Sequence, residues 1–479
     1  MNGCKKNIFL LIFCIFFVKI SLWSEETTSQ QSISYSIEEL LERYVSNDSE
    51  IKSLLIQLEK IQLSKKSADI NNGVHLNLST GNFIISSDSL KISPSVSLSV
   101  PNWNNTFIET TIPINSDLKS DTTKIDGTSF SIGTDILGGS GRQSQLTARK
   151  AERNVLEAER AIVTRALKAE EEFYNKLKTI YSQYAKTLTL QNTLYDKELN
   201  LETVKVKGFA KTSSKYRTAE LEVLSAQGVV DQQKRELQRS LDSFGKDCGL
   251  DAGSLNLSDI PSVKNIVLHS GILDNPVTGS LENYIPMENS QWNLRMAQEE
   301  NNINSQVNIS FAGGYTYKNQ LQRGADTIDT SLSLKTMGAT LHGGITFPIT
   351  GDNKIPSASL SLSWSPDTMR NQLIQEKQNQ LHIDNSLLKI TEAENKYQLA
   401  MEANKSTWED LLWNRQVKYE EYALYEELAN DNEIWHTQGL ISDTEYRRSI
   451  TNSDNALIQA YISDIDILLH SIKTRQMFI

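Results

Sequence analysis

The stretch SASLSLSWSPDTMRNQLIQEKQ, residues 357–378, contains the two patterns on which the fold depends. Up to Trp364, apolar residues alternate with serine, which is typical of a strand with one wet face. From Thr368 onward, arginine, glutamine, glutamate and lysine predominate, and these residues favour helices. No proline follows Pro366. The sequence therefore predicts a strand that leads directly into a long helix.

Two regions carry the alternating pattern, residues 74–136 and 306–364. Aromatic residues lie near the ends of their runs: Trp103, Tyr315, Tyr317 and Trp364. Runs of this length with aromatic ends fit the strands of an outer-membrane β-barrel. A soluble β-sandwich insertion would alternate equally well. The export signal and the long helices described below favour the membrane interpretation.

Two proline-free zones, residues 114–260 and 367–479, indicate long unbroken structure. In residues 141–206, apolar residues follow each other at helical steps: Phe173, Leu177, Ile180, Tyr184 and Leu188. A second helical pattern runs from about Thr368 to Thr437, and a third runs from Tyr446 to the end. Helices of this length predict coiled-coil-like packing against neighbouring helices.

Each helical arm is interrupted once, in the first at Gly208 and in the second at Gly439. Glycine suits the left-handed position just after a helix end. Ser442 and Glu445 form a capping-box pattern that restarts the second arm, while Thr212 or Ser213 would cap the restart of the first. Both arms therefore read as helical hairpins, over residues 141–245 and 367–475.

The N-terminal residues MNGCKKNIFLLIFCIFFVKISLWSEE combine a basic start with an eleven-residue apolar run from Ile8 to Val18. This pattern predicts a secretory signal peptide over residues 1–24, with an uncleaved membrane anchor as the alternative. Cys4 and Cys14 leave with the signal. The mature chain then keeps Cys248 alone, and no internal disulfide is possible.

The composition and the missing motifs exclude several classes of function. The 479 residues are 38% hydrophobic and carry a net charge of −11. No stretch beyond the signal is apolar enough for a spanning helix, which excludes a polytopic helical membrane protein. The acidic balance argues against a general nucleic-acid binder. P-loop, HExxH and CxxC motifs are absent and the six histidines are scattered. We therefore expect no enzyme, no cofactor and no metal site.

The two halves of the sequence match each other at offsets of 230–233 residues. The matching stretches are INNGVHLNLSTG (70–81) with INSQVNISFAGG (303–314), TSFSIGT (128–134) with ASLSLSW (358–364), and KGFAKTSSKYR (207–217) with QGLISDTEYR (438–447). Agreement at three separated places predicts an internal duplication. The predicted organisation is a first repeat at 25–260, a linker at 261–285 and a second repeat at 286–479.

This order of elements resembles the TolC family of outer-membrane efflux proteins. The opening YSIEELLERYVSNDSEIKSLLIQLEKIQLSKKSADI (35–70) is similar to the family's first helix, with Asn47, Ser49 and Glu50 in its polar kink. SLSLSWSPDTMRNQLIQEKQ (359–378) resembles the passage from barrel to periplasmic helix. QGLISDTEYRRSITNSDNALIQAYISDIDILL (438–469) resembles the last hairpin. The resemblance covers about residues 36–475.

The resemblance implies a mixed α+β membrane protein that works as a homotrimer in the outer membrane. Each protomer would give four strands to a twelve-stranded barrel, continued by a periplasmic tube of helices. This chain has enough β material for more than two strands in each half. A periplasmic adaptor protein and an inner-membrane pump would dock at the tube, as in multidrug efflux or type I secretion. The alternative function is an exported helical-rod structural or adhesion protein with a β head.

The resemblance also implies candidate site residues. Acidic residues that follow the second glycine turn line the tube entrance in the family, and the matching position here is Glu445. Arg448 stands where the family has its second acidic residue, and Asp443 in the turn would substitute for that missing acid. Tyr446, Arg447 and Arg448 would take part in gating, and Tyr216 with Arg217 occupies the equivalent place in the first repeat. The adaptor would contact the hairpin tips: Gly208, Phe209, Gly439, Leu440 and Ser442.

Simpler roles exist for the same residues. Glu445 fits a capping box without any pore role. The two glycines fit plain helix ends, and the charged residues fit a solvated helix face.

Overall fold

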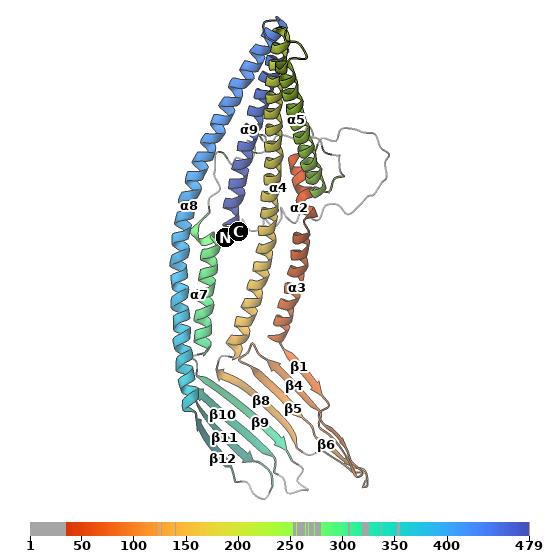
Figure 1. Cartoon of the computed structure of the whole chain (residues 1–479). Coiled ribbons are helices and arrows are strands. Elements are labelled where there is room, and N and C mark those ends of the chain that lie inside the picture. Colours follow the sequence, from red (N-terminus) through yellow and green to blue (C-terminus); the bar gives the residue numbers. More distant parts are fainter. Residues whose placement is uncertain are drawn as a thin grey trace.

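The computed structural model describes residues 35–478 apart from Asp121, Asp126, Gly139, 252–254, 256–263, 265–266, 268–272, 274–278, 305–306, 319–324, Met337 and 352–354. The molecule is elongated, with an antiparallel sheet at one end and two helical hairpin tips at the other (Figure 1). The expected signal peptide and most of the expected linker lie outside the described residues.

The first half of the chain runs from helix to strands to helical hairpin. Its helices are α2 (Ile37–Asn47), α3 (Ser49–Asn71), α4 (Ser140–Val206) and α5 (Ser214–Asp247). Its strands are β1 (His75–Ser79), β2 (Phe83–Ile85), β3 (Ser89–Ile92), β4 (Ser95–Val100), β5 (Thr106–Thr111), β6 (Ile114–Asp117), β7 (Thr122–Ile125) and β8 (Thr128–Leu137).

The second half repeats this order. A short 3-10 helix, η2 (Leu281–Asn283), precedes the helices α7 (Ile285–Asn304), α8 (Pro366–Thr437) and α9 (Asp443–Gln476). The strands are β9 (Asn308–Tyr317), β10 (Thr327–Thr336), β11 (Ala339–Pro348) and β12 (Ser357–Trp364). The expected mixed α+β class is therefore confirmed.

The main sheet has eight antiparallel strands in the order β1-β4-β5-β8-β9-β10-β11-β12. Each half supplies four neighbouring strands, and the β8–β9 pair joins the halves. The TolC resemblance implied four strands for the whole protomer, and that number is wrong for this chain. An even number of strands in each half still returns the chain to the end of the sheet from which it entered. The helices therefore all lie beyond the same end of the sheet (Figure 1).

The first half also forms a second, smaller sheet with the strand order β2-β3-β6-β7. The pairing of β4 with β5 continues in the same register into the pairing of β3 with β6. On either side of this continuous ladder the register shifts by one residue. The shift lies near Gly81 between the β1–β4 and β2–β3 pairings, and near Gly127 between the β5–β8 and β6–β7 pairings. The φ angles of Gly81 and Gly127 are +63° and +83°. A Cβ at Gly81 would lie 1.9 Å from the Ser93 carbonyl oxygen, so only glycine fits there.

Cross-strand pairing sorts the side chains of the main sheet into two faces. One complete row across all eight strands is Leu76, Leu98, Ile108, Ile132, Gly313, Thr330, Ile345 and Ala358. The adjacent row on the opposite face is Asn77, Ser97, Glu109, Ser131, Gly314, Asp329, Thr346 and Ser357. The sheet thus has one mainly apolar face and one mainly polar face built of small residues.

Aromatic residues mark both ends of the apolar face. Phe130, Tyr315 and Phe347 lie in one cross-strand row, with Ile328 between the last two. Trp364 lies at the opposite end, where β12 leads into α8. None of the helices within the described residues contains an apolar window of the length needed to span a bilayer.

The helical layer is centred on α4 and α9, which pack against each other and carry most of the core. Phe173 of α4 is fully buried, and its ring contacts the rings of Tyr44, Tyr174 and Phe244 at centroid distances of 5.3–5.7 Å. Ile465 and several further residues of α9 complete this core. Helices α3 and α5 lie on the outer side of α4, and α8 lies on the outer side of α9 (Figure 1).

The kink between α2 and α3 is fixed by Asp48. Its side chain caps α3 by accepting hydrogen bonds from the backbone N–H groups of Glu50 and Ile51, at 2.7 and 3.0 Å. Arg165 of α4 forms an ion pair with the same carboxylate. Burial acts to raise the pKa of Asp48. The hydrogen bonds and the positive charge of Arg165 outweigh burial and lower the pKa below its usual value of 3.8.

We expect Asp48→Asn to lower the free energy of unfolding at pH 7 by about 1–2 kcal/mol, because asparagine keeps the cap but loses the charge facing Arg165. A carboxyl group with a lowered folded pKa contributes stability above its unfolded pKa and loses it as the pH falls through the folded pKa. The difference between the wild type and the variant should therefore shrink below about pH 3.8. Denaturant titrations at several pH values measure it, and a difference that stays constant down to pH 2 would contradict this account.

Candidate functional site at the hairpin tips

Both helical hairpins turn through the same backbone motif. At the second tip, Gly439 has φ +71°, its N–H donates to the His436 carbonyl at 2.9 Å, and the N–H of Leu440 donates to the Trp435 carbonyl at 2.8 Å. The first tip repeats these bonds: Gly208 (φ +73°) to Lys205 and Phe209 to Val204. This pair of bonds is the Schellman motif, in which glycine accepts the left-handed conformation.

Ser442 and Glu445 restart the helix after the second tip. The Ser442 hydroxyl accepts from the Glu445 N–H at 3.2 Å, and the Glu445 carboxylate accepts from the Ser442 N–H at 3.1 Å. The capping box read from the sequence is therefore present. Glu445 remains exposed to solvent, so its carboxylate also adds negative charge to the surface of the tip.

Asp443, Tyr446 and Arg447 contact residues of their own hairpin. The Asp443 carboxylate pairs with Arg447 at 2.8 Å and lies 3.7 Å from the Nε2 atom of His436. The ring of Tyr446 stacks on the His436 ring at a centroid distance of 4.7 Å. These contacts hold the start of α9 against the last turn of α8 and give no direct link to the first hairpin.

Arg448 does link the two hairpins. Its guanidinium lies 3.1 Å from the carboxylate of Asp196 on α4. About one turn further along α9, the Asn192 side-chain amide donates to the Asn452 side-chain oxygen at 2.8 Å. We call these two contacts, Arg448–Asp196 and Asn192–Asn452, the inter-hairpin latch. The sequence alone did not single out Asp196, because it is one of many charged residues on a long polar helix.

The first tip has a small apolar core of its own. Tyr216 is 7% exposed and packs with Val204 and Ala219 of the same hairpin. Lys215 lies over the ring of Phe209, with its Nζ atom 5.0 Å from the ring centroid. Tyr216 and Tyr446 therefore hold their own hairpins together in different ways.

Large apolar side chains are exposed at both tips. Leu440 is 69% exposed, Phe209 is 37% exposed and Val206 is 88% exposed. Exposed apolar side chains at the end of a polar helical rod are typical of a contact surface.

A buried ion pair lies further from the tips, where α8 packs on α9. Asp464 is fully buried and accepts hydrogen bonds from Arg415 and from the hydroxyl of Tyr419, both at 2.6 Å. Burial, and then the hydrogen bond to Asp464, raise the pKa of Tyr419. Each polar atom of Asp464 thus has a partner, which is what a buried carboxylate requires. This cluster positions the two helices.

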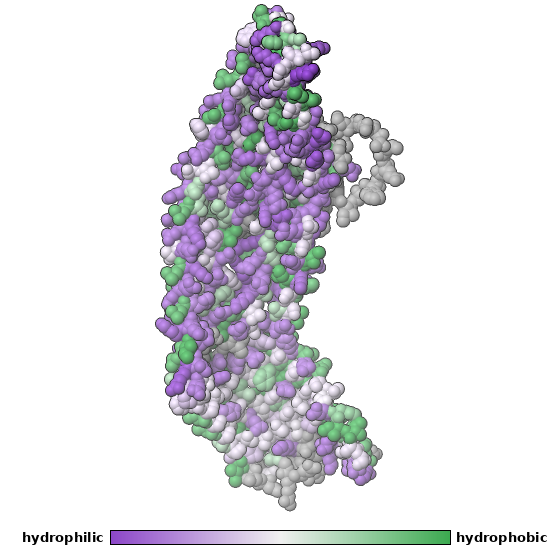
Figure 2. Space-filling view, in the orientation of Figure 1, coloured by the Kyte–Doolittle hydropathy of each residue, from purple (hydrophilic) through white to green (hydrophobic). Residues whose placement is uncertain are grey.

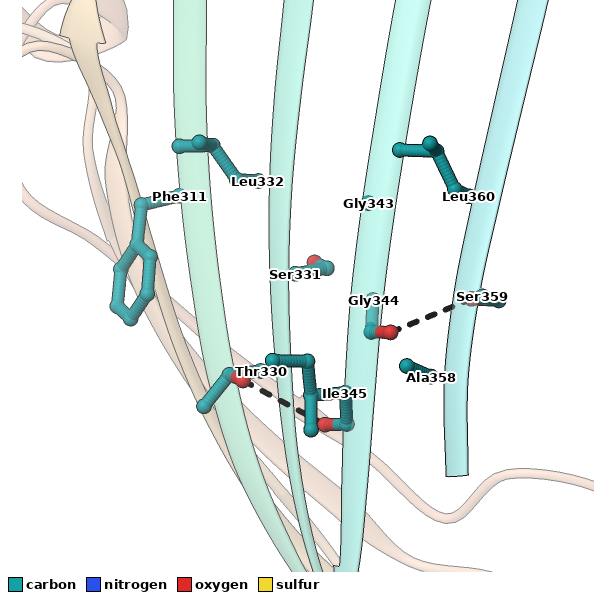
Figure 3. Close-up of a pocket in the computed structure, with 10 residues that line it drawn as sticks. All are labelled: Phe311, Thr330, Ser331, Leu332, Gly343, Gly344, Ile345, Ala358, Ser359 and Leu360. Atoms are coloured by element: carbon teal, nitrogen blue, oxygen red, sulfur yellow. Dashed lines mark hydrogen bonds between the residues drawn. The ribbon is translucent and has the colours of Figure 1, made fainter. Parts of the chain in front are cut away.

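The apolar face of the sheet carries a shallow hollow of about 390 Å³ (Figure 3). Gly343 has no side chain between Leu332 and Leu360, its partners on the neighbouring strands, and this absence opens the hollow. Its lining contains no titratable side chain. Within the described ranges, no three His, Cys, Asp or Glu side chains gather so as to hold a metal ion. The side chains around this hollow therefore suit apolar contact.

Two family models match the chain in succession. Residues 40–263 match the TP096X N-terminal domain, and residues 277–479 match the TP096X C-terminal domain. The chain carries both TP096X domains. Asp196 lies in the N-terminal TP096X domain and Arg448 in the C-terminal one, so the inter-hairpin latch joins the two domains.

Similar proteins share low sequence identity with this TP096X chain. An uncharacterized protein of Treponema pallidum (strain Nichols) is 23% identical over 429 residues, which is 87% of this chain and 76% of the relative. Among solved structures, the outer membrane protein VceC of Vibrio cholerae is 10% identical, with a TM-score of 0.48 and coverage of 91% of this chain and 95% of VceC. The CmeC outer membrane channel of Campylobacter jejuni is 9% identical, with a TM-score of 0.47 and coverage of 96% and 90%.

We expect Gly439→Ala to destabilise the second hairpin by about 1–2 kcal/mol, because alanine in the left-handed region is strained even where space is free. Gly228, inside α5, is the matched control. A Cβ added there would also have no atom within 4 Å, and Gly228→Ala should stabilise the helix by up to about 1 kcal/mol. Thermal unfolding of both variants measures the effects, and equal shifts in Tm would contradict the role of the left-handed turn.

Proposed function

We propose that this chain is a TolC-like outer-membrane channel that exports substrates as a passive duct. Its sheet inserts into the outer membrane as part of a barrel, and its helices extend into the periplasm as a tube. A periplasmic adaptor protein and an inner-membrane pump deliver substrates to the tube, and the pump supplies the energy and selects the cargo. Multidrug efflux and type I secretion are the two transport modes open to such a duct.

The single observation that carries this proposal is the sorting of the sheet into two faces. In the row from Leu76 to Ala358, six of the eight residues are apolar and the other two are Gly313 and Thr330, whereas the row from Asn77 to Ser357 contains no large apolar residue. A soluble β head would bury its apolar face against a second layer. Here large apolar side chains of that face remain exposed, with Leu332 at 50%, Phe130 at 45% and Ile132 at 41%. Lipid on one side and water on the other satisfy both faces.

The hairpin tips supply the proposed gate. The inter-hairpin latch ties α9 of the second hairpin to α4 of the first. When these polar contacts break, the second hairpin is free to move away from the first and widen the entrance, a two-state change. Phe209 and Leu440, exposed at the tips, are the proposed contact points for the adaptor.

The function is tested on the purified full chain. We expect trimers that only detergent extracts and that dissociate on heating in a denaturing gel. We also expect ion-conducting single channels in planar lipid bilayers. A monomer that salt washing releases from the membrane, without conductance, would favour the helical-rod adhesion protein instead.

We expect Asp196→Asn to raise the open probability of single channels by about 2–5-fold, because an exposed ion pair contributes up to about 1 kcal/mol to the closed state. The matched control is Glu222→Gln. Glu222 pairs with Lys197, the neighbour of Asp196, at 3.1 Å and with similar exposure, but that pair stays within the first hairpin. An equal rise in open probability for both variants would contradict the proposed role of the inter-hairpin latch in gating.

Glu445→Gln tests the acidic entrance. Glutamine keeps the reciprocal bond of the capping box but removes the charge, so stability should hold while the cation preference of the channel falls. Reversal potentials in a salt gradient measure this preference. Unchanged potentials would leave Glu445 as a capping residue without a pore role.

A further inference from the structure

The small sheet β2-β3-β6-β7 projects from the end of the main sheet that lies farthest from the helices (Figure 1). We call these four strands, which lie within residues 83–125, the arm. Within the described residues, the strands of the arm pair only with one another. The second half of the chain forms no comparable sheet in the part that the structure describes. The arm therefore belongs to the first half alone, and the proposed duct does not require it.

Cross-strand pairing sorts the arm into two faces. One face has an apolar row across all four strands, formed by Phe83, Ile92, Ile114 and Ile125. The adjacent row on the opposite face consists of Ile84, Lys91, Asn115 and Lys124. In the apolar row, Phe83 is 56% exposed and Ile125 is 49% exposed. Figure 2 shows apolar side chains gathered on the arm, at the lower right of the view. The arm is thus amphipathic, and its apolar face is open.

The apolar face of the arm continues the apolar face of the main sheet. The β3–β6 pairing keeps the register of the β4–β5 pairing, and the Ile112 N–H donates to the Pro94 carbonyl between them at 2.9 Å. Side chains along a strand alternate between the two faces. Ile92 lies an even number of positions from Leu98, and Ile114 lies an even number from Ile108. The row of Ile92 and Ile114 therefore lies on the side that the proposed function assigns to lipid.

A glycine or a proline interrupts each of the four connections between the arm and the main sheet. These residues are Gly81 between β1 and β2, Pro94 between β3 and β4, Pro113 between β5 and β6, and Gly127 between β7 and β8. Proline has no N–H group to donate to the ladder, and both glycines have positive φ angles. Pairing is weakest along this line, which we call the hinge line, so the arm bends there at the least cost.

A straight arm would carry its apolar row out of the membrane. The aromatic row that contains Phe130 marks one membrane interface of the proposed barrel, and Val96 lies in the same row. Ile92 lies four residues further out along the ladder. At about 3.3 Å per residue and a tilt of about 40°, this places its row about 10 Å beyond the interface. The headgroup layer is only about 5–8 Å thick, so the row would meet water.

Lipid is the occupant that fits the apolar face of the arm. In the proposed barrel this face points away from the pore, so the arms of copies within one barrel do not cover one another. A bend at the hinge line lays the same face on the membrane surface. Lys91 and Lys124, on the opposite face, then remain in water.

We propose that the arm bends at the hinge line and lies on the outer leaflet, with its apolar face at the boundary between the lipid headgroups and the acyl chains. The side of the sheet that meets lipid rests on the proposed function. The two faces and the hinge line come from the pairing and sequence of the arm itself.

Spin labels on single cysteines test this contact in the full chain, reconstituted into phosphatidylcholine vesicles. Ile125→Cys places the label on the apolar face of the arm, and Lys124→Cys, its neighbour on the opposite face, is the matched control. Leu332→Cys reports on the main sheet. Cys248 is 1% exposed and serves as the unreactive background. Electron paramagnetic resonance measures how readily each label meets oxygen, which concentrates in the bilayer, or a nickel chelate, which stays in water.

We expect oxygen to reach the labels at positions 125 and 332, and the nickel chelate to reach the label at position 124. The label at 125 should lie about 5–10 Å into the boundary between headgroups and acyl chains, the depth of an interfacial amphipathic segment, and the label at 332 should lie deeper. Phe83→Cys and Ile84→Cys repeat the comparison on the other edge strand of the arm, and they apply if a label on β7 disturbs folding.

The outcomes separate this inference from the proposed function. Equal access of the nickel chelate to positions 124 and 125, with position 332 in lipid, would overturn the lipid contact of the arm and keep the barrel. A label at 125 that neither reagent reaches would indicate a protein contact and would also overturn it. A label at 332 that meets water while the label at 125 meets lipid would keep the arm contact and reject the channel. Labels at both positions in water would reject both.

Discussion

Antiparallel pairing of eight strands in fixed register is the constraint on which the rest of the structure depends. It places Leu76, Ile132 and Ile345 on one face of the sheet, and Asn77, Ser131 and Thr346 on the other. A slip of one residue in any strand would exchange its faces. The glycines at the two register shifts, Gly81 and Gly127, let the outer strands bend without disturbing the central pair. The even strand count in each half then returns the helices to one end.

The helical part is organised differently from the sheet. Its central helices, α4 and α9, bury an aromatic and aliphatic core around Phe173 and Ile465, while polar contacts position the helices that pack on them. Arg415 and Tyr419 hold the buried Asp464, and Asp48 fixes the kink of α2 and α3. Nearer the tips, the Arg448–Asp196 pair of the inter-hairpin latch is about half exposed to solvent. Weak, solvated contacts suit a part of the molecule that is proposed to open.

Much of this fold is readable from the sequence because its patterns are local. The alternation in 357–364, the helical steps around Phe173 and the glycine turns all act over a few residues. The capping box of Ser442 and Glu445 is confirmed for the same reason. The strand count was not readable, since alternation marks strand material without showing where hairpins divide it. Asp196 was missed because its partner, Arg448, lies 252 positions away on another helix.

The sequence by itself determined the class of each segment, because periodicity, proline placement and glycine turns reflect the backbone nearby. It also determined which residues are apolar and which are polar. Only the tertiary structure decided that all eight strands join one sheet and that Arg448 meets Asp196. These features depend on contacts between residues far apart in the chain. No local pattern encodes such contacts, since they form only when both halves pack together.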